Sequence, residues 1–254
     1  MRRLRHIAIE GPIGAGKSTL ASLLAPPLGA ELLLERPHDN PFLKDFYIDG
    51  GRYAFQTQLL FLFQRVELTR SLAQPGMFAP LIVSDFTLEK DRLFARLTLS
   101  DEEHRLYSMV HERVAPKLPS PDLVIWLDGP MVVLRDRITR RGRAMERRIE
   151  NDYLRAVADA YGAYFDAHTD LPLLVVDIDR FDPLRKPADL QYLLERIAAF
   201  TGPRESLLSP PTIAGLWRAD RSAVGANRRL KRCCSASCCS AKATSSRCST
   251  NTAR

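Results

Sequence analysis

Short, continuously apolar segments alternate with longer segments of helical periodicity along residues 1–200. The short segments have the length of β-strands and lie at residues 6–10, 31–35, 80–85, 122–128 and 171–177. Helical patterns cover residues 17–28, 53–72, 101–117, 131–141, 148–168 and 187–200. Apolar strands that alternate with helices are typical of a parallel sheet covered on both faces. The pattern therefore predicts one α/β domain with a five-stranded parallel sheet and helices on both faces.

The pattern breaks down after Gly202, where Pro, Ser, Ala, Arg and Cys replace periodic apolar residues. A segment of this kind buries too little apolar surface to offset the entropy that is lost on ordering. We therefore expect a domain at residues 1–202 and a disordered tail at residues 203–254, with at most one short helix near residues 214–217.

The tail accounts for the charge and the cysteines of the chain. The 254 residues include 37 Lys or Arg and 30 Asp or Glu, which makes the net charge +7. Ten of the basic and two of the acidic residues lie in residues 201–254, so the remainder is close to neutral. The folded part thus gives no indication of a nucleic-acid or membrane partner. All five cysteines also lie in the tail, so the domain has no disulfide framework, and a thiolate metal site there would lack a fold to fix its geometry.

The composition is that of an ordinary globular protein, with 45% hydrophobic and 26% charged residues. No segment of 18 uninterrupted apolar residues occurs, which excludes a membrane-spanning helix. Residues 1–6 run directly into the first predicted strand and lack the apolar core and cleavage site of a secretory signal. We expect a cytoplasmic protein.

A phosphate-binding sequence follows the first predicted strand. Residues 11–18 match the pattern G-x-x-x-x-G-K-[ST] and stand between a predicted strand and a predicted helix. Glycines let backbone N–H groups turn toward a phosphate at the helix N-terminus, while Lys17 meets the β- and γ-phosphates and the hydroxyl of Ser18 can bind Mg²⁺. The expected nucleotide site comprises Gly11, Pro12, Ile13, Gly14, Ala15, Gly16, Lys17, Ser18 and Thr19. The chain is therefore predicted to bind a nucleoside triphosphate.

A single carboxylate, Asp85, stands at the end of the third predicted strand. A motor or transport ATPase would carry an acidic pair there, and a GTPase would carry N-K-x-D and D-x-x-G motifs, which this chain lacks in the required places. Asp85 therefore favours a small-molecule kinase, in which it would bind Mg²⁺ together with Ser18.

Four separated blocks of the chain have the residues and spacing of one family. They are residues 6–18, Glu35 with residues 39–47, residues 53–58 with the sequence Tyr-Ala-Phe-Gln-Thr-Gln, and residues 137–146 with Arg-Gly-Arg-x-x-Glu. With these blocks the chain resembles the deoxynucleoside kinases, especially the bacterial deoxyadenosine/deoxyguanosine kinase type. The resemblance implies a P-loop NTPase-like fold with an arginine-rich lid.

The resemblance implies roles for residues on the acceptor side of the site. Glu35 follows the second strand, at the edge where an open α/β sheet places its active site, and resembles the general base for a 5′-hydroxyl. Tyr47 and Glu146 resemble the pair that holds the sugar 3′-hydroxyl. Gln56 resembles the residue that pairs with the nucleobase, because a carboxamide offers a donor beside an acceptor. The alternatives are a solvated Glu35, a core Gln56 and a Glu146 that only forms an ion pair on a helix.

The resemblance also implies that Arg137, Arg141 and Arg143 are lid arginines that stabilise the transferring phosphate. Together with Lys17 and Glu35 they form the predicted catalytic set. A nucleic-acid patch is the alternative for this arginine-rich stretch, but no aromatic residues are interleaved with the arginines.

Two departures from the better-known pattern affect the acceptor site. Residues 85–87 are Asp-Phe-Thr where Glu-Arg-Ser is expected, so the phosphate contact of that arginine must come from elsewhere. Asp91 resembles the acid that faces the base, but its usual arginine partner is replaced by Phe63. The preferred base stays open, and the acidic Asp91 favours an amino-bearing base and hence a purine deoxynucleoside.

These observations predict an ATP-dependent deoxynucleoside kinase of nucleotide salvage, with Mg²⁺ as cofactor, a small-molecule deoxynucleoside as substrate and a homodimeric assembly. One alternative, a thymidylate-kinase-like nucleoside monophosphate kinase, would need an acceptor-site arginine, commonly in D-R-[YH] after the third strand, and residues 85–87 argue against it. The other alternative, a non-catalytic nucleotide- or nucleic-acid-binding module, would have no need of Glu35 or the lid arginines.

Overall fold

The structure is a computed structural model that describes residues 4–73, 81–116 and 119–207. Six strands form one sheet in the order β2-β3-β1-β4-β5-β6, and all neighbouring strands are parallel. The strands are β1 (His6–Glu10), β2 (Glu31–Leu33), β3 (Ile82–Ser84), β4 (Leu123–Asp128), β5 (Leu173–Asp177) and β6 (Arg204–Leu207). The predicted α/β fold with a parallel sheet is confirmed, with six strands in place of five.

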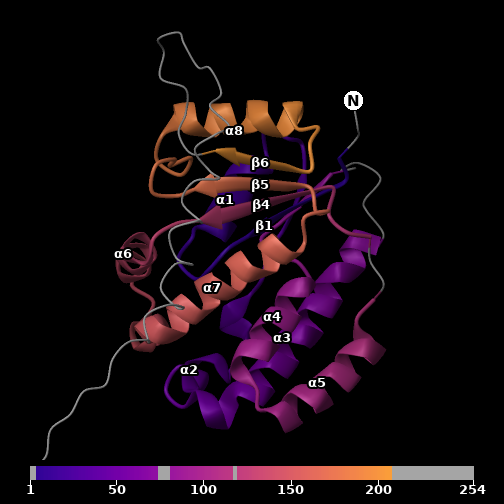
Figure 1. Cartoon of the computed structure of the whole chain (residues 1–254), viewed down its shortest axis with the longest axis vertical. Helices are drawn as coiled ribbons and strands as arrows, with labels where there is room; N and C mark the ends of the chain where they lie inside the picture. Colours follow the sequence, from indigo (N-terminus) through magenta and orange to yellow (C-terminus); the bar gives the residue numbers. More distant parts are fainter. Residues whose placement is uncertain (1–3, 74–80, 117–118, 208–254) are drawn as a thin grey trace, which may run out of the picture. The chain divides into compact units, whose positions relative to one another are not determined.

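The helices agree with the predicted pattern in most of the chain (Figure 1). They are α1 (Lys17–Leu24), α2 (Leu43–Phe46), α3 (Gly50–Ala73), α4 (Glu89–Thr98), α5 (Asp101–Val114), α6 (Met131–Arg141), α7 (Asn151–Ala167) and α8 (Pro187–Ala199), with short 3-10 turns η1 (Pro37–Asp39) and η2 (Ala144–Arg148). Helices α2 and α4 were not among the predicted elements, and α1 ends four residues earlier than expected.

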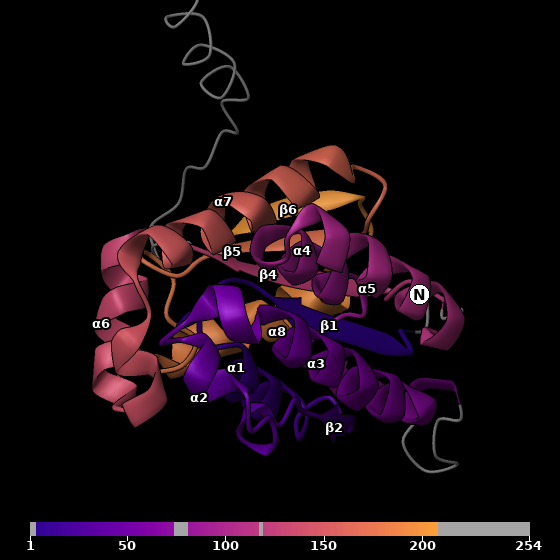
Figure 2. The same ribbon diagram turned by 90° about the horizontal axis from the view of Figure 1, so that it is seen from below.

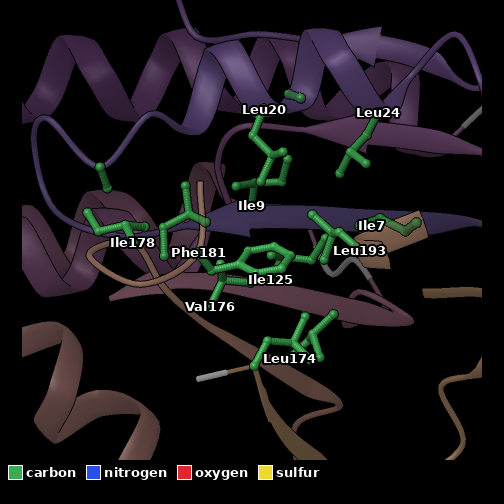
Figure 3. Close-up of a cluster of buried hydrophobic side chains, with 14 of the residues drawn as sticks. Ile7, Ile9, Leu20, Leu24, Ile125, Leu174, Val176, Ile178, Phe181 and Leu193 are labelled. Carbon is green, nitrogen blue, oxygen red and sulfur yellow. The ribbon is translucent and has the colours of Figure 1, made fainter. Parts of the chain in front are cut away.

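Alternate residues of each strand point to opposite faces of the sheet, and each face has its own helices. On one face, Leu20 and Leu24 of α1 point toward Ile9 and Ile7 of β1, and α8 contributes Leu193 to the same cluster (Figure 3). The cluster continues along the inner residues of β4 and β5, of which Ile125 and Leu174 are fully buried. Packing on this face therefore fixes the position of β1 relative to α1, and with it the position of the loop that connects them.

Helix α7 covers the opposite face, where Val124 and Trp126 of β4 pack against Tyr161 and Phe165. Helix α4 lies next to α7, and α3, α4 and α5 pack against one another beside the sheet (Figures 1 and 2). Helices α3, α4 and α7 line one side of the space beyond the carboxyl ends of the strands, where open parallel sheets bind ligands.

Strand β6 corrects the predicted end of the domain. Residues 204–207 pair in parallel with β5, and Leu207 is only 3% exposed in the core that α8 covers. The sheet thus extends past Gly202, and the expected tail cannot begin at residue 203. Residues 208–254, including the short helix expected near residues 214–217, lie outside the described residues. Within the described ranges, the helices are too short or too polar to cross a membrane.

Candidate active site

The phosphate loop connects β1 to α1 and requires glycine for steric reasons. Gly11 and Gly14 have φ angles of 148° and 89°, a region that L-residues with a side chain rarely adopt. A Cβ atom on Gly11 would stand 2.5 Å from the carbonyl oxygen of Leu127, and one on Gly14 would stand 2.7 Å from that of Leu134. The loop therefore packs its backbone directly against the segments at the end of β4 and in α6.

One cleft opens above this loop and brings together most of the predicted site. Its lining residues from the phosphate loop and α1 are Ile13, Gly14, Gly16, Lys17, Ser18 and Thr19. The other lining residues are Glu35, Pro37, Leu43, Phe46, Tyr47, Thr57, Gln58, Phe61, Arg65, Asp85, Lys90, Phe94, Arg141, Arg143, Met145, Glu146 and Tyr153. Gly11, Pro12 and Ala15 complete the loop behind this lining. The cleft thus has a phosphate-binding end at α1 and an aromatic end at α2, α3 and α7.

Lys17 begins α1 and turns its ammonium group toward the loop. Its Nζ donates hydrogen bonds to the carbonyl oxygens of Gly11 at 2.7 Å and Pro12 at 3.0 Å. Burial and, to a smaller extent, the positive charge of Lys90 lower the pKa of Lys17 to about 8, against the opposing charges of nearby carboxylates. Two cations therefore face the same part of the cleft.

Glu35 lies just after β2 and is held by two cations. Its Oε1 accepts a hydrogen bond from Nε of Arg65 at 2.5 Å, and its Oε2 accepts one from Nζ of Lys90 at 2.6 Å. Burial alone would raise the pKa of Glu35, but Arg65 and Lys90 outweigh it and hold this pKa at about 2. Glu35 is therefore a carboxylate at neutral pH, with its side chain 10% exposed at the edge of the cleft.

Arg65 also binds Asp91, which lies beneath the cleft. Arg65 forms an ion pair with Asp91 through its second nitrogen, and Asp91 is fully buried. Burial raises the pKa of Asp91 to about 6 although Arg65 opposes the shift. Asp91 does not line the cleft, so its expected position facing the base is not what the structure shows. Its arginine partner exists and is Arg65.

Ser18 and Asp85 are adjacent, as a shared metal site requires. The hydroxyl of Ser18 donates a hydrogen bond to Oδ2 of Asp85, and Oδ1 of Asp85 accepts one from the backbone N–H of Glu35 at 2.8 Å. Burial raises the pKa of Asp85, and the nearby Glu35 raises it in the same direction. A hydroxyl and a carboxylate next to the phosphate loop are the oxygen ligands that Mg²⁺ prefers, so these residues fit that ion.

The arginine-rich segment, which runs from the second half of α6 to just beyond its end, reaches the cleft through two of its three predicted arginines. Nη2 of Arg141 lies 2.7 Å from Oε2 of Glu146, and Nη1 of Arg143 lies 3.4 Å from Oε1 of the same carboxylate. Arg137 instead donates hydrogen bonds to the carbonyl oxygens of Ala15 at 2.8 Å and Ile178 at 3.1 Å. Arg141 and Arg143 therefore line the cleft with Glu146, while Arg137 supports the phosphate loop from behind.

Tyr47 lines the cleft beside this lid segment. Burial raises the pKa of Tyr47, and the charge of Glu146 raises it in the same direction. Its ring also packs against Phe46, with the centroids 5.6 Å apart. The predicted neighbourhood of Tyr47 and Glu146 is therefore present at the aromatic end of the cleft.

On α3, two residues that line the cleft lie two positions after the two that were predicted. Gln56 is exposed and does not line the cleft, and Phe63 is 46% exposed on the outer side of the helix. Gln58 is only 3% exposed and lines the cleft, as does Arg65, seven residues further along. Two residues along an α-helix correspond to a rotation of about 200°, which places Gln56 and Gln58 on opposite sides.

The sequence does not mark the buried face of α3 by an apolar stripe, because most of its buried residues are polar. Its buried positions are Ala54, Thr57, Gln58, Leu62, Arg65 and Thr69, which follow one another at helical spacing. Lys90 was missed because α4 itself was not predicted.

Buried Glu10 links three elements beneath the site. Its Oε1 accepts hydrogen bonds from the backbone N–H of Thr87 at 2.6 Å and the Thr87 hydroxyl at 2.8 Å, and its Oε2 accepts one from the Tyr161 hydroxyl at 2.8 Å. Glu10 thereby fixes the segment between β3 and α4, which carries Asp85 and leads into Lys90 in the first turn of α4.

The fold and the cleft define a P-loop protein with the groups needed to bind a nucleotide beside an acceptor. The family model described as deoxynucleoside kinase matches residues 7–201. A deoxyguanosine kinase from Bacillus subtilis is 33% identical over 204 residues, which cover 78% of this chain and 97% of that protein. A deoxyadenosine kinase from Dictyostelium discoideum is 31% identical and is matched over 70% of this chain and 74% of its own length.

The solved structures agree with the sequence comparisons. The deoxyadenosine kinase of M. mycoides with bound products has a TM-score of 0.68 and 25% sequence identity, and the match covers 76% of this chain and 99% of that chain. The chain therefore belongs to the deoxynucleoside kinase family. The predicted phosphorylation of deoxynucleosides is confirmed at this level, and the monophosphate-kinase and non-catalytic alternatives are not favoured.

Proposed function

We propose that the cleft binds ATP and a deoxynucleoside together and transfers the γ-phosphate of ATP to the 5′-hydroxyl, with Glu35 as general base. The observation that carries this proposal is the placement of Lys17 and Glu35 in one cleft, on either side of Asp85. The ligands named for the M. mycoides structures, which are dATP, dCTP, and dCMP with dCDP, support a nucleotide in this place.

The phosphate loop and Lys17 would bind the triphosphate, since the loop ends at the N-terminus of α1. Ser18 and Asp85 would hold Mg²⁺, which when bound neutralises charge on the phosphates. Arg141 and Arg143 would meet the phosphoryl group from the lid side and stabilise the charge that is spread over its oxygens in the transition state.

Glu35 would accept the proton of the 5′-hydroxyl as the new oxygen–phosphorus bond forms. Its pKa of about 2 keeps the carboxylate ionised, so it acts mainly by orienting the hydroxyl, and it takes the proton late in the transfer. The bond between the γ-phosphorus and the bridging oxygen breaks, and ADP leaves with the electron pair.

Gln58 is the side chain that we propose pairs with the nucleobase, with Phe61 and Phe94 beside it in the cleft. We propose purine deoxynucleosides as the preferred acceptors, supported by the relatives named deoxyguanosine and deoxyadenosine kinases. Asp91 no longer supports this preference directly, because it lies buried against Arg65. The homodimer and the cytoplasmic location stay predictions.

A substrate panel tests the proposal. Four deoxynucleosides are each assayed with ATP and with GTP as donors, and formation of the 5′-monophosphate is measured. We expect the highest kcat/KM for deoxyadenosine or deoxyguanosine with ATP. A higher value for thymidine or deoxycytidine would overturn the purine preference, and no transfer from ATP to any of them would overturn the proposed reaction.

A further inference from the structure

Lys90 is a buried cation in the cleft for which the expected pattern of the site provides no role. Its side chain is 7% exposed, although it extends from the first turn of α4. Its Nζ donates to Oε2 of Glu35 at 2.6 Å and lies 5.8 Å from the ring centroid of Phe94. In the described part of the chain, Glu35 is its only hydrogen-bond partner, which leaves two of the three N–H groups of the ammonium available.

A second cation lies on the phosphate side of the same space. Lys17 is close enough to Lys90 for the charge of Lys90 to lower the pKa of Lys17. Two ammonium groups that converge on one cleft repel each other, and a bound polyanion offsets the repulsion. The available N–H groups of Lys90 therefore lie in a positively charged part of the cleft, which favours the binding of phosphate oxygens.

Residue 86, which follows β3, supplies no cation that could contact the phosphate. Phe86, where the resemblance leads us to expect arginine, is 1% exposed and packs against Leu33 and Ile82. Lys90 follows four residues later, at the start of α4, and reaches the space between the carboxylate and the phosphate loop.

We propose that Lys90 is a catalytic residue, whose ammonium group orients Glu35 and contacts the phosphoryl group during its transfer. This inference rests on the proposed function, since it takes Glu35 as the base and the phosphate loop as the ATP site. Lys90 reaches the reaction from the acceptor side, whereas Lys17, Arg141 and Arg143 reach it from the donor and lid sides.

The charge changes of the reaction explain why a cation is useful here. The proton of the acceptor hydroxyl moves to Glu35, the oxygen–phosphorus bond forms, and the bond to the bridging oxygen of ADP breaks. As the hydroxyl proton approaches Glu35, the attraction of this carboxylate for Lys90 weakens while negative charge remains on the phosphoryl group that is being transferred. Lys90 keeps its proton throughout and shifts its contact from the carboxylate to a phosphoryl oxygen, so its contact is stronger in the transition state than in the ground state.

The experiment compares Lys90→Met with Lys90→Arg and with Lys44→Met, a control at an exposed lysine of α2 outside the cleft. We expect Lys90→Met to lower kcat by roughly 10²–10³-fold, the usual loss for one electrostatic contact to the transition state. The KM for the deoxynucleoside should change by less than about threefold, since Lys90 contacts the reacting groups and not the base. We expect Lys90→Arg to recover part of kcat and Lys44→Met to match the parent.

The split between kcat and KM gives a readout that a merely structural role would not produce. A damaged cleft would raise the KM for the deoxynucleoside as kcat falls, whereas loss of a contact to the reacting groups lowers kcat and leaves this KM nearly unchanged. A kcat of Lys90→Met within threefold of the parent, or a KM that rises by the factor by which kcat falls, would overturn the proposal.

Two further variants keep the result decisive. If Lys90→Met does not fold by circular dichroism, Lys90→Gln carries the same test, because it keeps a donor to Glu35 without the charge. Glu35→Gln is measured in parallel. If Glu35→Gln keeps the parental rate, the proposed function fails; if it loses activity while the Lys90 variants do not, only the role of Lys90 fails.

Discussion

Nε of Arg65 donates a hydrogen bond to Oε1 of Glu35 at 2.5 Å, and this contact joins α3 to the loop that follows β2. The same guanidinium forms an ion pair with Asp91 at the start of α4. One buried arginine thus connects three segments that are far apart in the sequence. The position of the Glu35 carboxylate therefore depends on Arg65 as well as on β2, the strand that precedes Glu35.

Replacing Arg65 should therefore cost stability as well as activity. Arg65→Met leaves the buried Asp91 without its cation and Glu35 with Lys90 alone, a loss of about 3–5 kcal/mol in the free energy of unfolding. The pKa values of Glu35 and Asp91 rise when the cation is removed, so the loss should shrink as the pH falls and the carboxylates take up protons. Urea denaturation at several pH values measures this, with Phe63→Ala on the exposed side of α3 as control. An equal effect of the two substitutions would contradict the buried network.

The two glutamines of α3 form a matched pair of positions. Gln58→Ala removes a carboxamide from the cleft and should lower kcat/KM for the deoxynucleoside by roughly 10–100-fold, the cost of about 1–3 kcal/mol for leaving polar partners unpaired. Gln56→Ala, on the exposed side, should stay within twofold of the parent. Steady-state kinetics on both variants decide between the positions. If kcat/KM fell further in Gln56→Ala than in Gln58→Ala, the residue that pairs with the base would be Gln56, as the family resemblance implied.

The lid arginine should act on the chemical step more than on acceptor binding. Arg141→Ala should lower kcat by about 10³-fold or more, in line with arginines that stabilise phosphoryl transfer. Because Arg141 also contacts Glu146, the KM for the deoxynucleoside should rise, but by a smaller factor than kcat falls. Arg140→Ala is the control, since Arg140 pairs with Asp136 outside the cleft. An unchanged kcat with a raised KM would assign Arg141 to the acceptor site alone.

The sixth strand predicts different outcomes for two truncations. Removal of residues 203–254 also removes β6, which pairs with β5 and buries Leu207, so the melting temperature should fall. Removal of residues 208–254 keeps the strand, and we expect activity and melting temperature close to those of the full chain. Thermal denaturation of both truncations tests this. Equal melting temperatures would show that β6 contributes little to stability.

The sequence predicted the elements whose patterns are strong and missed those that depend on their neighbours. Strands β1, β4 and β5 are continuous apolar runs, and the phosphate loop has a specific motif. Strand β6, with the sequence Arg-Glu-Ser-Leu, lies at the sheet edge and buries only its last residue, so no apolar pattern marks it. Helix α4 is rich in charged residues, and two of them, Lys90 and Asp91, are buried because they face partners from other segments.

The candidate site shows the same division. Residues next to a motif or at a strand end, such as Lys17, Ser18, Glu35 and Asp85, could be placed from the sequence and lie together in the structure. On α3, the letters Phe-Gln-Thr-Gln contain two glutamines, and choosing between them requires knowing which face of the helix is buried. That face is decided by packing against other helices and the sheet, which the local sequence does not contain.

The most direct test of the central claim is the rate of phosphoryl transfer in Glu35→Gln. The substitution keeps the size of the side chain but removes the carboxylate that would orient and deprotonate the 5′-hydroxyl. With saturating ATP and deoxynucleoside, kcat should fall by roughly 10²–10⁴-fold, while the Kd for ATP stays close to the parental value and Glu31→Gln, at an exposed position of β2, remains fully active. A kcat for Glu35→Gln within threefold of the parent would contradict the assignment of Glu35 as the base.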